Sequence, residues 1–341
     1  MLPTITAHSF LFALHQTSIS NYYTRESLPV STMHIAQVTS WGQPPVYTTA
    51  PDIPPAGPGQ LRLKIVAAAV HRLVQARAIG LHFSATKLPL DPSTDGMGLD
   101  EATGQLYYIP TFVAPTFADY AVVDCTHVIP VPKGADAITI AALCNPVMSS
   151  WMALRTRTWA LPVGFSVLII GATGTSGRAA VAVARAFGAG KVIGVARNQA
   201  ALNSIVDLDS YVVQKDEPET SDFASIGHVD VVLDYVYGDV TVAVLTALKP
   251  ERETQYVQIG TLGGEETMAL PAQLLRAKML RLTGSAPGSW TMAELKRELP
   301  DIVKMAAEME RPADVFTKSL SDVEAHWGSE DAKKKRMVLV P

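Results

Sequence analysis

The sequence predicts an α/β protein with a doubly wound parallel sheet and a second, β-rich domain formed from both chain ends. Three observations support this fold class. The chain has 341 residues, enough for about two domains of ~150 residues. Short apolar strands alternate with helical segments in its second half, and strand-like runs return towards its end. The expected parts are 33–145 for the start of the β-rich domain, 146–288 for the parallel-sheet domain and 289–341 for the return.

Composition favours a soluble protein with a small-molecule partner. Hydrophobic residues make up 48% of the chain, and 28 Lys and Arg against 32 Asp and Glu give a net charge of −4, which provides no basic field for nucleic acid. No continuous apolar run approaches the ~18 residues of a membrane-spanning helix. The two cysteines, Cys125 and Cys144, cannot form a multi-disulfide scaffold or a four-thiolate zinc lobe. We therefore expect a cytoplasmic protein that binds neither nucleic acid nor membranes.

Residues 1–32 are expected to form a disordered leader. They are rich in Ser and Thr and contain a single basic residue, Arg25. Secretory and mitochondrial signals carry more positive charge, so neither fits well. A targeting segment and an upstream start before Met33 both remain open.

The elements of the first half are short strands between Pro- and Gly-rich breaks. Strands are expected at 33–38, 61–66 and 118–123, and the breaks lie at 51–58 and 89–98. Together these features indicate a β-rich domain with long loops.

The second half reads as strands alternating with helices. A helix is expected over 147–160, after Asn145-Pro146, followed by a strand at 165–170, a helix at 178–188 and a strand at 191–195. Further expected elements are strands at 229–233, 256–259 and 280–282, a helix at 292–309, and strands at 314–316 and 336–340. Such short apolar runs are typical of a parallel sheet covered on both faces.

A glycine-rich turn, Gly171 to Gly177, directly follows the strand that ends at Ile170. Ala172, Gly174 and Gly177 occupy the three glycine positions of the dinucleotide fingerprint of Rossmann domains. At Gly174 a missing side chain lets the backbone approach a pyrophosphate, and the helix that follows offers free N–H groups. The strand, turn, helix and second strand together predict a dinucleotide site, although glycines also mark ordinary turns.

The end of the second strand indicates which dinucleotide is bound. An Asp or Glu at this place would bond the ribose 2′-hydroxyl of NAD, but the chain has Ala196-Arg197-Asn198. Because Arg197 can pair with a 2′-phosphate, NADP(H) is favoured. The alternative is that Arg197 is merely a solvated charge.

With these motifs, the chain resembles the zinc-independent, quinone oxidoreductase-like (enoyl reductase-like) branch of the medium-chain dehydrogenase/reductase superfamily. The matching stretches are Ala56–Gln60, Ala141–Pro146, Gly171–Gly177, Asp234-Tyr235, Val257–Thr261 and Leu282–Ser285. The resemblance implies a GroES-like catalytic domain, a Rossmann domain inserted in it, and a substrate cleft between them. It also implies a set of cofactor-binding residues: Asn145, Ser149, Gly171, Ala172, Thr173, Gly174, Thr175, Ser176, Gly177, Arg197, Asn198, Tyr235, Gly260, Thr261 and Leu262.

The chain departs from the zinc-dependent members of this superfamily. Where those proteins place a Cys ligand and a Gly-His-Glu segment, this chain has His71 and Ser93-Thr94-Asp95. One imidazole without the thiolate and a second histidine cannot form the usual three-ligand site, so we expect no metal. Without a Lewis acid the acceptor should already be activated, as a quinone or an α,β-unsaturated carbonyl compound is.

The expected function is therefore NADPH-dependent hydride transfer to such an acceptor without zinc. The candidate proton donors are His71 and the pair Tyr107 and Tyr108, expected in a loop before Pro110. Two alternatives remain: a trans-acting enoyl reductase of a biosynthetic pathway, and a non-catalytic protein that binds or senses NADPH. The expected partner is a quinone, enone or enoyl compound, and a homodimer is suggested by analogy with the family.

Overall fold

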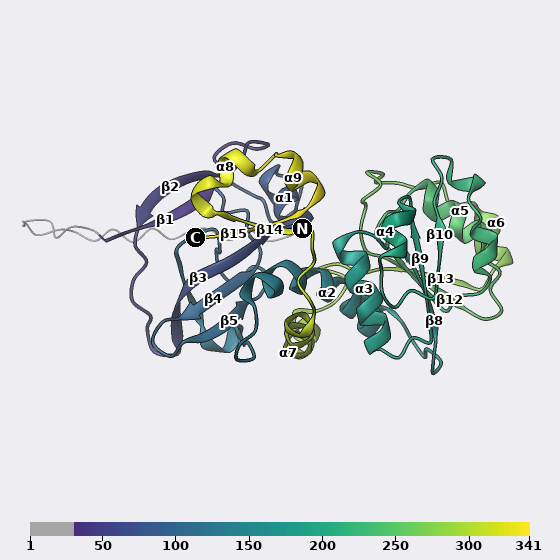
Figure 1. Cartoon of the computed structure of the whole chain (residues 1–341), viewed down its shortest axis with the longest axis horizontal. Helices are drawn as coiled ribbons and strands as arrows, with labels where there is room; N and C mark the ends of the chain where they lie inside the picture. Colours follow the sequence, from purple (N-terminus) through teal and green to yellow (C-terminus); the bar gives the residue numbers. More distant parts are fainter. Residues whose placement is uncertain (1–30) are drawn as a thin grey trace, which may run out of the picture. The chain divides into compact units, whose positions relative to one another are not determined.

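The protein is described by a computed structural model covering residues 31–341 (Figure 1). The expected leader at 1–32 lies outside the described residues except at its end, where Thr32 already belongs to the first strand. The described residues form one compact unit from Thr32 to Pro341. The order and pairing of its strands confirm the predicted fold class.

A six-stranded parallel sheet forms the middle of the chain, in the order β10-β9-β8-β11-β12-β13. Its strands are β8 (Ser166–Ile170), β9 (Lys191–Ala196), β10 (Ser210–Val213), β11 (Val231–Asp234), β12 (Thr254–Gln258) and β13 (Leu280–Gly284). Four helices accompany them: α3 (Thr175–Ala186), α4 (Gln199–Asn203), α5 (Asp239–Ala247) and α6 (Ala272–Ala277). Val167 and Ile169 of β8 belong to one hydrophobic cluster and Leu168 and Ile170 to another, so both faces of this strand are covered. The strand order reverses between β8 and β11, where such sheets bind ligands.

The second sheet combines both ends of the described chain. Its order is β14-β15-β3-β4-β5-β7, and β6 also pairs with β3. The strands are β3 (Gln60–Val70), β4 (Gly96–Asp100), β5 (Gln105–Ile109), β6 (Tyr120–Asp124), β7 (Ile129–Pro130), β14 (Val315–Ser319) and β15 (Arg336–Val340). A separate antiparallel pair is formed by β1 (Thr32–Gln37) and β2 (Val46–Pro51). Figure 1 shows the yellow strand β15 beside the blue strand β3, as expected for a domain built from both ends.

A long helix, α2 (Ala137–Arg157), corrects the expectation of a helix over 147–160. The helix starts ten residues earlier, where Asp136 accepts hydrogen bonds from Ile138 N and Thr139 N at 3.2 Å. Pro146 lies inside it rather than before it, although proline cannot donate its backbone bond. Thirteen buried residues of α2 explain the continuity, because their packing outweighs the local preference for a break.

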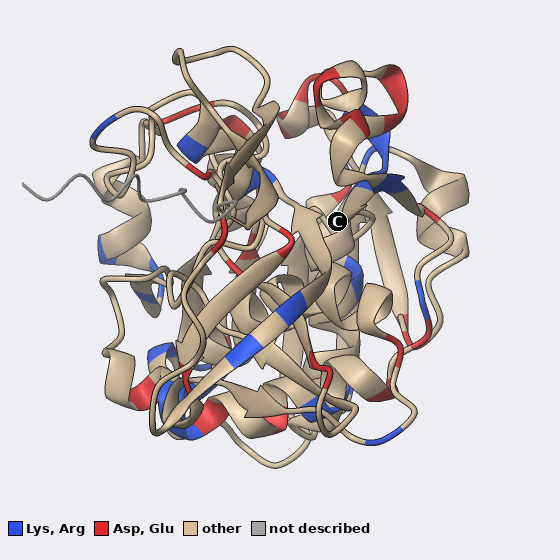
Figure 2. Ribbon diagram, turned by 90° about the vertical axis from the view of Figure 1, so that its left-hand side faces the viewer, with Lys and Arg blue, Asp and Glu red and all other residues tan. Residues whose placement is uncertain are grey.

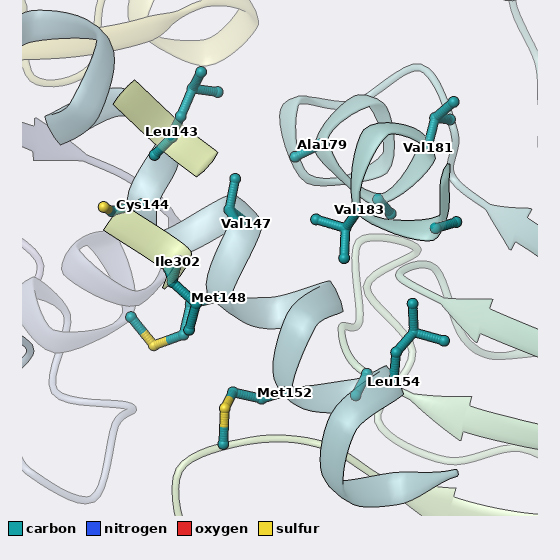
Figure 3. Packing of buried hydrophobic residues seen from close by; sticks show 14 of the residues in the cluster. Leu143, Cys144, Val147, Met148, Met152, Leu154, Ala179, Val181, Val183 and Ile302 are labelled. Atoms are coloured by element: carbon teal, nitrogen blue, oxygen red, sulfur yellow. The ribbon is translucent and has the colours of Figure 1, made fainter. Parts of the chain in front are cut away.

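Tertiary packing also explains the apolar composition of α2. Its 21 residues are long and apolar enough on average to cross a membrane, although polar residues interrupt the run, and 78% of that window is buried. Helix α2 packs against α3, against α7 (Met292–Glu308) and against β3. Figure 3 shows side chains of all three helices in one cluster, among them Met148, Val183 and Ile302. α2 is therefore a core helix, buried among other elements of the protein.

The remaining elements are short. They are α1 (Arg72–Ala78), α8 (Val323–His326), α9 (Glu330–Lys334) and the 3-10 turns Cys125–His127, Pro218–Thr220, Phe223–Ile226 and Leu320–Asp322. Basic and acidic segments are interspersed over the face of the molecule seen in Figure 2. That face thus presents no uniformly basic stripe.

Candidate functional site

The turn between β8 and α3 is shaped by its glycines. Gly171 has φ +90°, and a Cβ on Gly177 would lie 2.2 Å from Gly171 O, so no other residue fits at Gly177. Gly174 differs, because a Cβ there would meet only Gly171 O at 3.6 Å. The space in front of Gly174 is therefore open, and the turn fits the close approach of a phosphate group.

Helix α3 presents its N-terminus at this open space. Gly174 is its N-cap and provides no side-chain cap. The first intrahelical bond runs from Arg178 N to Gly174 O at 2.9 Å, so the N–H groups of Thr175, Ser176 and Gly177 precede the helical ladder. Free N–H groups at the positive end of a twelve-residue helix are suited to an anion.

Three further predicted residues meet at the carboxyl ends of the neighbouring strands. Tyr235 follows β11, and its N–H donates to Ile170 O at 3.1 Å, at the end of β8. A Cβ on Gly260, after β12, would lie 3.0 Å from Tyr235 O. The Tyr235 hydroxyl lies 3.3 Å from Ser149 Oγ on α2, and burial raises the pKa of Tyr235 to about 12. The phenol therefore stays protonated at neutral pH.

The other residues predicted around this edge are more open. Asn145 lies on α2 one turn before Ser149 and is half-buried. Thr261 and Leu262 are exposed, and Leu262 N donates to Tyr235 O at 2.9 Å. Both segments therefore border the site that Tyr235 helps to form.

Arg197 and Asn198 follow β9 and are exposed, but their surroundings differ. Asn198 Oδ1 accepts a hydrogen bond from Ala201 N at 3.0 Å and caps α4. The Arg197 guanidinium makes no ion pair with any residue in 31–341, so it is available to a ligand.

Asp234 organises the loop after β11, a role that the sequence did not reveal. Its Oδ1 accepts from Val236 N at 2.8 Å and Tyr237 N at 3.0 Å, and its Oδ2 accepts from Tyr256 Oη at 2.9 Å. These bonds fix the backbone that carries Tyr235. An Asp at the end of an otherwise apolar strand was the available signal.

A buried polar cluster lies in the other half of the molecule. We call His71, Thr94, Asp95 and Tyr108 the His71 cluster. His71 Nε2 lies 3.0 Å from Asp95 Oδ1, and the Thr94 hydroxyl donates to the same oxygen at 2.7 Å. Tyr108 Oη donates to Asp95 Oδ2 at 2.8 Å. Each of the four residues is at most 4% exposed.

Electrostatics within the cluster follow from this geometry. Burial acts to raise the pKa of Asp95, but its bond to His71, the charge of His71 and the two hydroxyl donors outweigh burial and hold that pKa below its usual value. Burial and the Asp95 charge raise the pKa of Tyr108 well above its usual value. His71 Nδ1 is buried and has no hydrogen-bond partner among residues 31–341. Nε2 of the His71 ring is thus held by Asp95, whereas Nδ1 remains available to a ligand.

The two tyrosines lie in strand β5, not in the expected loop. Their apolar neighbours Leu106 and Ile109 favour a strand, and β5 pairs with β4 in register Gly98↔Tyr107. Successive strand residues point to opposite faces, so Tyr108 joins the core cluster of α2 while Tyr107 packs in a different one. The structure therefore does not bring the tyrosines to one site.

Within the described part of the chain, no group of three or more His, Cys, Asp and Glu side chains is placed to hold a metal ion. His71 and Asp95, at the positions where zinc-dependent proteins carry ligands, bond to each other instead.

A scan against protein-family models finds no match. The chain is 41% identical over 355 aligned positions to the "Probable NADPH-dependent quinone reductase tdiC" of Emericella nidulans, covering 91% of this chain and all of that protein. The chain belongs to the quinone oxidoreductase family. The quinone oxidoreductase of Homo sapiens is 26% identical over 215 residues, 60% of this chain and 63% of the human protein.

Solved structures show the family fold. The quinone oxidoreductase of Thermus thermophilus has a TM-score of 0.70 at 22% identity, and the match covers 91% of this chain and all of that structure. A structure titled as a complex of Etr1p with NADP and crotonyl-CoA has a TM-score of 0.74 at 15% identity, with the same coverage. These matches confirm the predicted two-domain fold.

Proposed function

We propose that this protein is an NADPH-dependent quinone reductase that transfers hydride to a quinone or a related α,β-unsaturated carbonyl compound without zinc. The observation that carries the proposal is the open turn at Gly174 in front of the α3 N-terminus, at the point where the sheet order reverses. The 41% identity to a relative named as an NADPH-dependent quinone reductase supports it.

The chain's own residues would bind and orient the cofactor. The N–H groups of Thr175, Ser176 and Gly177 face the open turn and would hold the pyrophosphate. The unpaired Arg197 guanidinium would pair with the 2′-phosphate that distinguishes NADPH from NADH. When bound, NADPH supplies the hydride, and the protein positions its donor carbon against the acceptor. Asn145, Ser149 and Tyr235 border the same sheet edge and would orient the nicotinamide end.

Of the three candidate proton donors, His71 has the most suitable surroundings. The Tyr108 hydroxyl already donates a hydrogen bond to Asp95, and Tyr107 packs on the opposite face of β5. In contrast, His71 Nε2 bonds to Asp95 and leaves Nδ1 without a protein partner among the described residues. His71 would donate a proton from Nδ1 to the acceptor oxygen while Asp95 holds the ring at Nε2. Hydride plus this proton converts the quinone to the hydroquinone, and solvent then reprotonates His71.

The test pairs binding with turnover on one preparation. NADPH and NADH are titrated by fluorescence, and NADPH oxidation is then followed with a panel of quinones and enones. We expect tighter binding of NADPH than of NADH and turnover with quinones. NADPH binding without reduction of any acceptor would contradict the proposal and favour a non-catalytic NADPH sensor. Turnover with enoyl thioesters but not with quinones would favour a trans-acting enoyl reductase.

We further propose that the enzyme works in the cytoplasm as a homodimer. Strand β13 forms one edge of the parallel sheet, and Leu275 and Met279 just before it are each 51% exposed. Pairing of two such edges would continue the sheet and cover these side chains. Sedimentation of the purified protein distinguishes dimer from monomer.

A further inference from the structure

Residues 260–265, which we call the β12 loop, begin with residues predicted to contact the cofactor. Leu262 N donates to Tyr235 O and Gly263 N donates to Val236 O, both at 2.9 Å, so the β12 loop pairs with the loop that follows β11. The two loops are in close contact, because a Cβ on Gly263 would lie 3.0 Å from Val236 O. The position of the β12 loop therefore depends on the backbone just before α5.

Glu265 connects the β12 loop to helix α5. Its Oε2 accepts a hydrogen bond at 2.9 Å from the N–H of Asp239, the first residue of α5. The N-cap of α5 is Gly238, which has no side chain to serve as a cap. The Glu265 carboxylate takes that role from another segment of the chain, and its negative charge suits the positive end of the helix.

Gly238 leaves the space that this carboxylate occupies. A Cβ on Gly238 would overlap the Glu265 carboxylate, so any other residue there would displace it. Gly238 is also buried and has φ +78°, in the region that favours glycine. The Glu265 side chain is thus held by the shape of the helix start as well as by its hydrogen bond.

The other end of α5 is capped by a charge of the opposite sign. Lys278, which precedes β13, donates from Nζ to Leu245 O, Thr246 O and Leu248 O at 2.9, 2.5 and 2.6 Å. A cation suits the negative end of a helix, so Lys278 and Glu265 both stabilise α5. Of the two, only Glu265 belongs to the β12 loop. This difference separates an effect on the helix from an effect on the loop.

We propose that Glu265 is a positioning residue that fixes the β12 loop, and with it the nicotinamide end of the cofactor, by capping α5. This inference rests on the proposed reductase function, in which Gly260, Thr261 and Leu262 border the cofactor. Glu265 acts through the loop backbone and not by contact with the reacting atoms. A small displacement of a reacting group lowers the rate of transfer strongly. Loss of Glu265 should therefore impair hydride transfer more than NADPH binding, which the glycine turn before α3 mainly provides.

Hydrogen exchange of the ligand-free protein tests the loop directly. Glu265→Ala should speed exchange of the backbone amides of 262–264 about three- to tenfold, the size of a lost helix cap. Glu265→Gln keeps an oxygen that can accept from Asp239 N and should restore the wild-type rate. Lys278→Met removes the opposite cap and should speed exchange at 245–248 but not in the β12 loop. Unchanged exchange in Glu265→Ala, or equal loosening of the loop in Lys278→Met, would overturn the proposal.

Kinetic measurements then connect the loop to the reaction. With the fastest acceptor of the quinone and enone panel, Glu265→Ala should lower kcat about ten- to a hundredfold and change the NADPH Kd less than about twofold. Glu265→Gln and Lys278→Met should keep kcat within about twofold of wild type, although Lys278→Met lowers the thermal midpoint.

Two outcomes separate this inference from the proposed function. If wild type reduces no acceptor but Glu265→Ala alone loosens the β12 loop, the role of Glu265 in the loop stands and the reductase function fails. If wild type reduces quinones and Glu265→Ala keeps the wild-type kcat, or if Lys278→Met lowers kcat as much as Glu265→Ala does, Glu265 is not a positioning residue.

Discussion

The glycine turn and the His71 cluster are two regions that would serve one reaction by different means. The turn uses backbone: N–H groups at the start of α3, and two glycines held where a side chain cannot fit. The His71 cluster uses side chains brought from three segments of the chain around one buried carboxylate. A site built from backbone groups is disrupted when a substitution adds side-chain volume. A side-chain network is disrupted when a substitution removes any one of its functional groups. Substitutions in the two regions should therefore change different properties of the protein.

The largest expected effect is on the side-chain region. His71→Asn removes the proposed donor and should lower kcat about 10²- to 10⁴-fold, the usual contribution of general acid catalysis. The NADPH Kd should not change, because His71 precedes α1 in the β-rich half, whereas the glycine turn lies between β8 and α3 of the parallel sheet. Stopped-flow turnover and fluorescence titration provide the measurements.

Asp95→Asn is the matched variant for His71→Asn. It keeps the donor but removes the carboxylate that holds its ring, so kcat should fall less than with His71→Asn. A solvent deuterium isotope effect in wild type that both variants alter is the readout that a purely structural role would not produce. Unchanged kcat in His71→Asn would remove His71 as the donor.

The next largest effect distinguishes Gly177, which has no room for a side chain, from Gly174, which does. Gly177→Val places a side chain against Gly171 O and should destabilise the fold by about 1–3 kcal/mol, seen as a lower midpoint in urea unfolding. Gly174→Ala has room in the protein alone, so its stability should stay close to that of wild type while NADPH binds more weakly. Equal loss of stability in both variants would show that the turn is not open at Gly174.

Arg197→Glu tests whether a side chain completes the backbone site. Loss of a charge-assisted bond should weaken NADPH binding by about 1.5–3 kcal/mol, roughly ten- to a hundredfold, and leave NADH nearly unaffected. Asn198→Ala is the control for local structure, because Asn198 caps α4 without the charge. Equal losses for both cofactors would contradict a role for Arg197 at the 2′-phosphate.

The smallest expected effect concerns Asp230. This residue precedes β11, so it lies at the amino-terminal ends of the parallel strands, away from both regions. Although burial acts to raise it, bonds from Arg252 and Ser166 hold the pKa of Asp230 at about 2, below its usual 3.8. This lowered pKa stabilises the fold fully above pH ~4, and the contribution is lost as pH falls towards 2. A pKa lower by about 1.8 corresponds to at most about 2.4 kcal/mol, and solvent around Arg252 reduces this contribution. Asp230→Asn should therefore lose less stability than wild type between pH 5 and 2 in urea unfolding, whereas an acid profile identical to wild type would contradict this role.

The two regions also differ in how far the sequence predicts them. The glycine turn could be identified because its strand, glycines and helix are contiguous between residues 166 and 186. The partners of Asp95 come from positions 24 residues before it and 13 residues after it, so no spacing rule brings them together. The same limit explains why α2 was expected to begin after Pro146. Long-range burial, which a local pattern does not contain, carries the helix through the proline.

Strand β15 has a consequence for how the protein is made. It lies between β14 and β3, so the second sheet, which combines both ends of the described chain, cannot be completed until residue 340 has been synthesised. The parallel sheet needs only residues 166–284 and can form while the ribosome is still extending the chain. During that interval β3 lacks one of its neighbours, and its open backbone edge is available to other nascent chains. Slower elongation would lengthen this vulnerable period, and a chaperone that covers exposed strand edges should act on the N-terminal half.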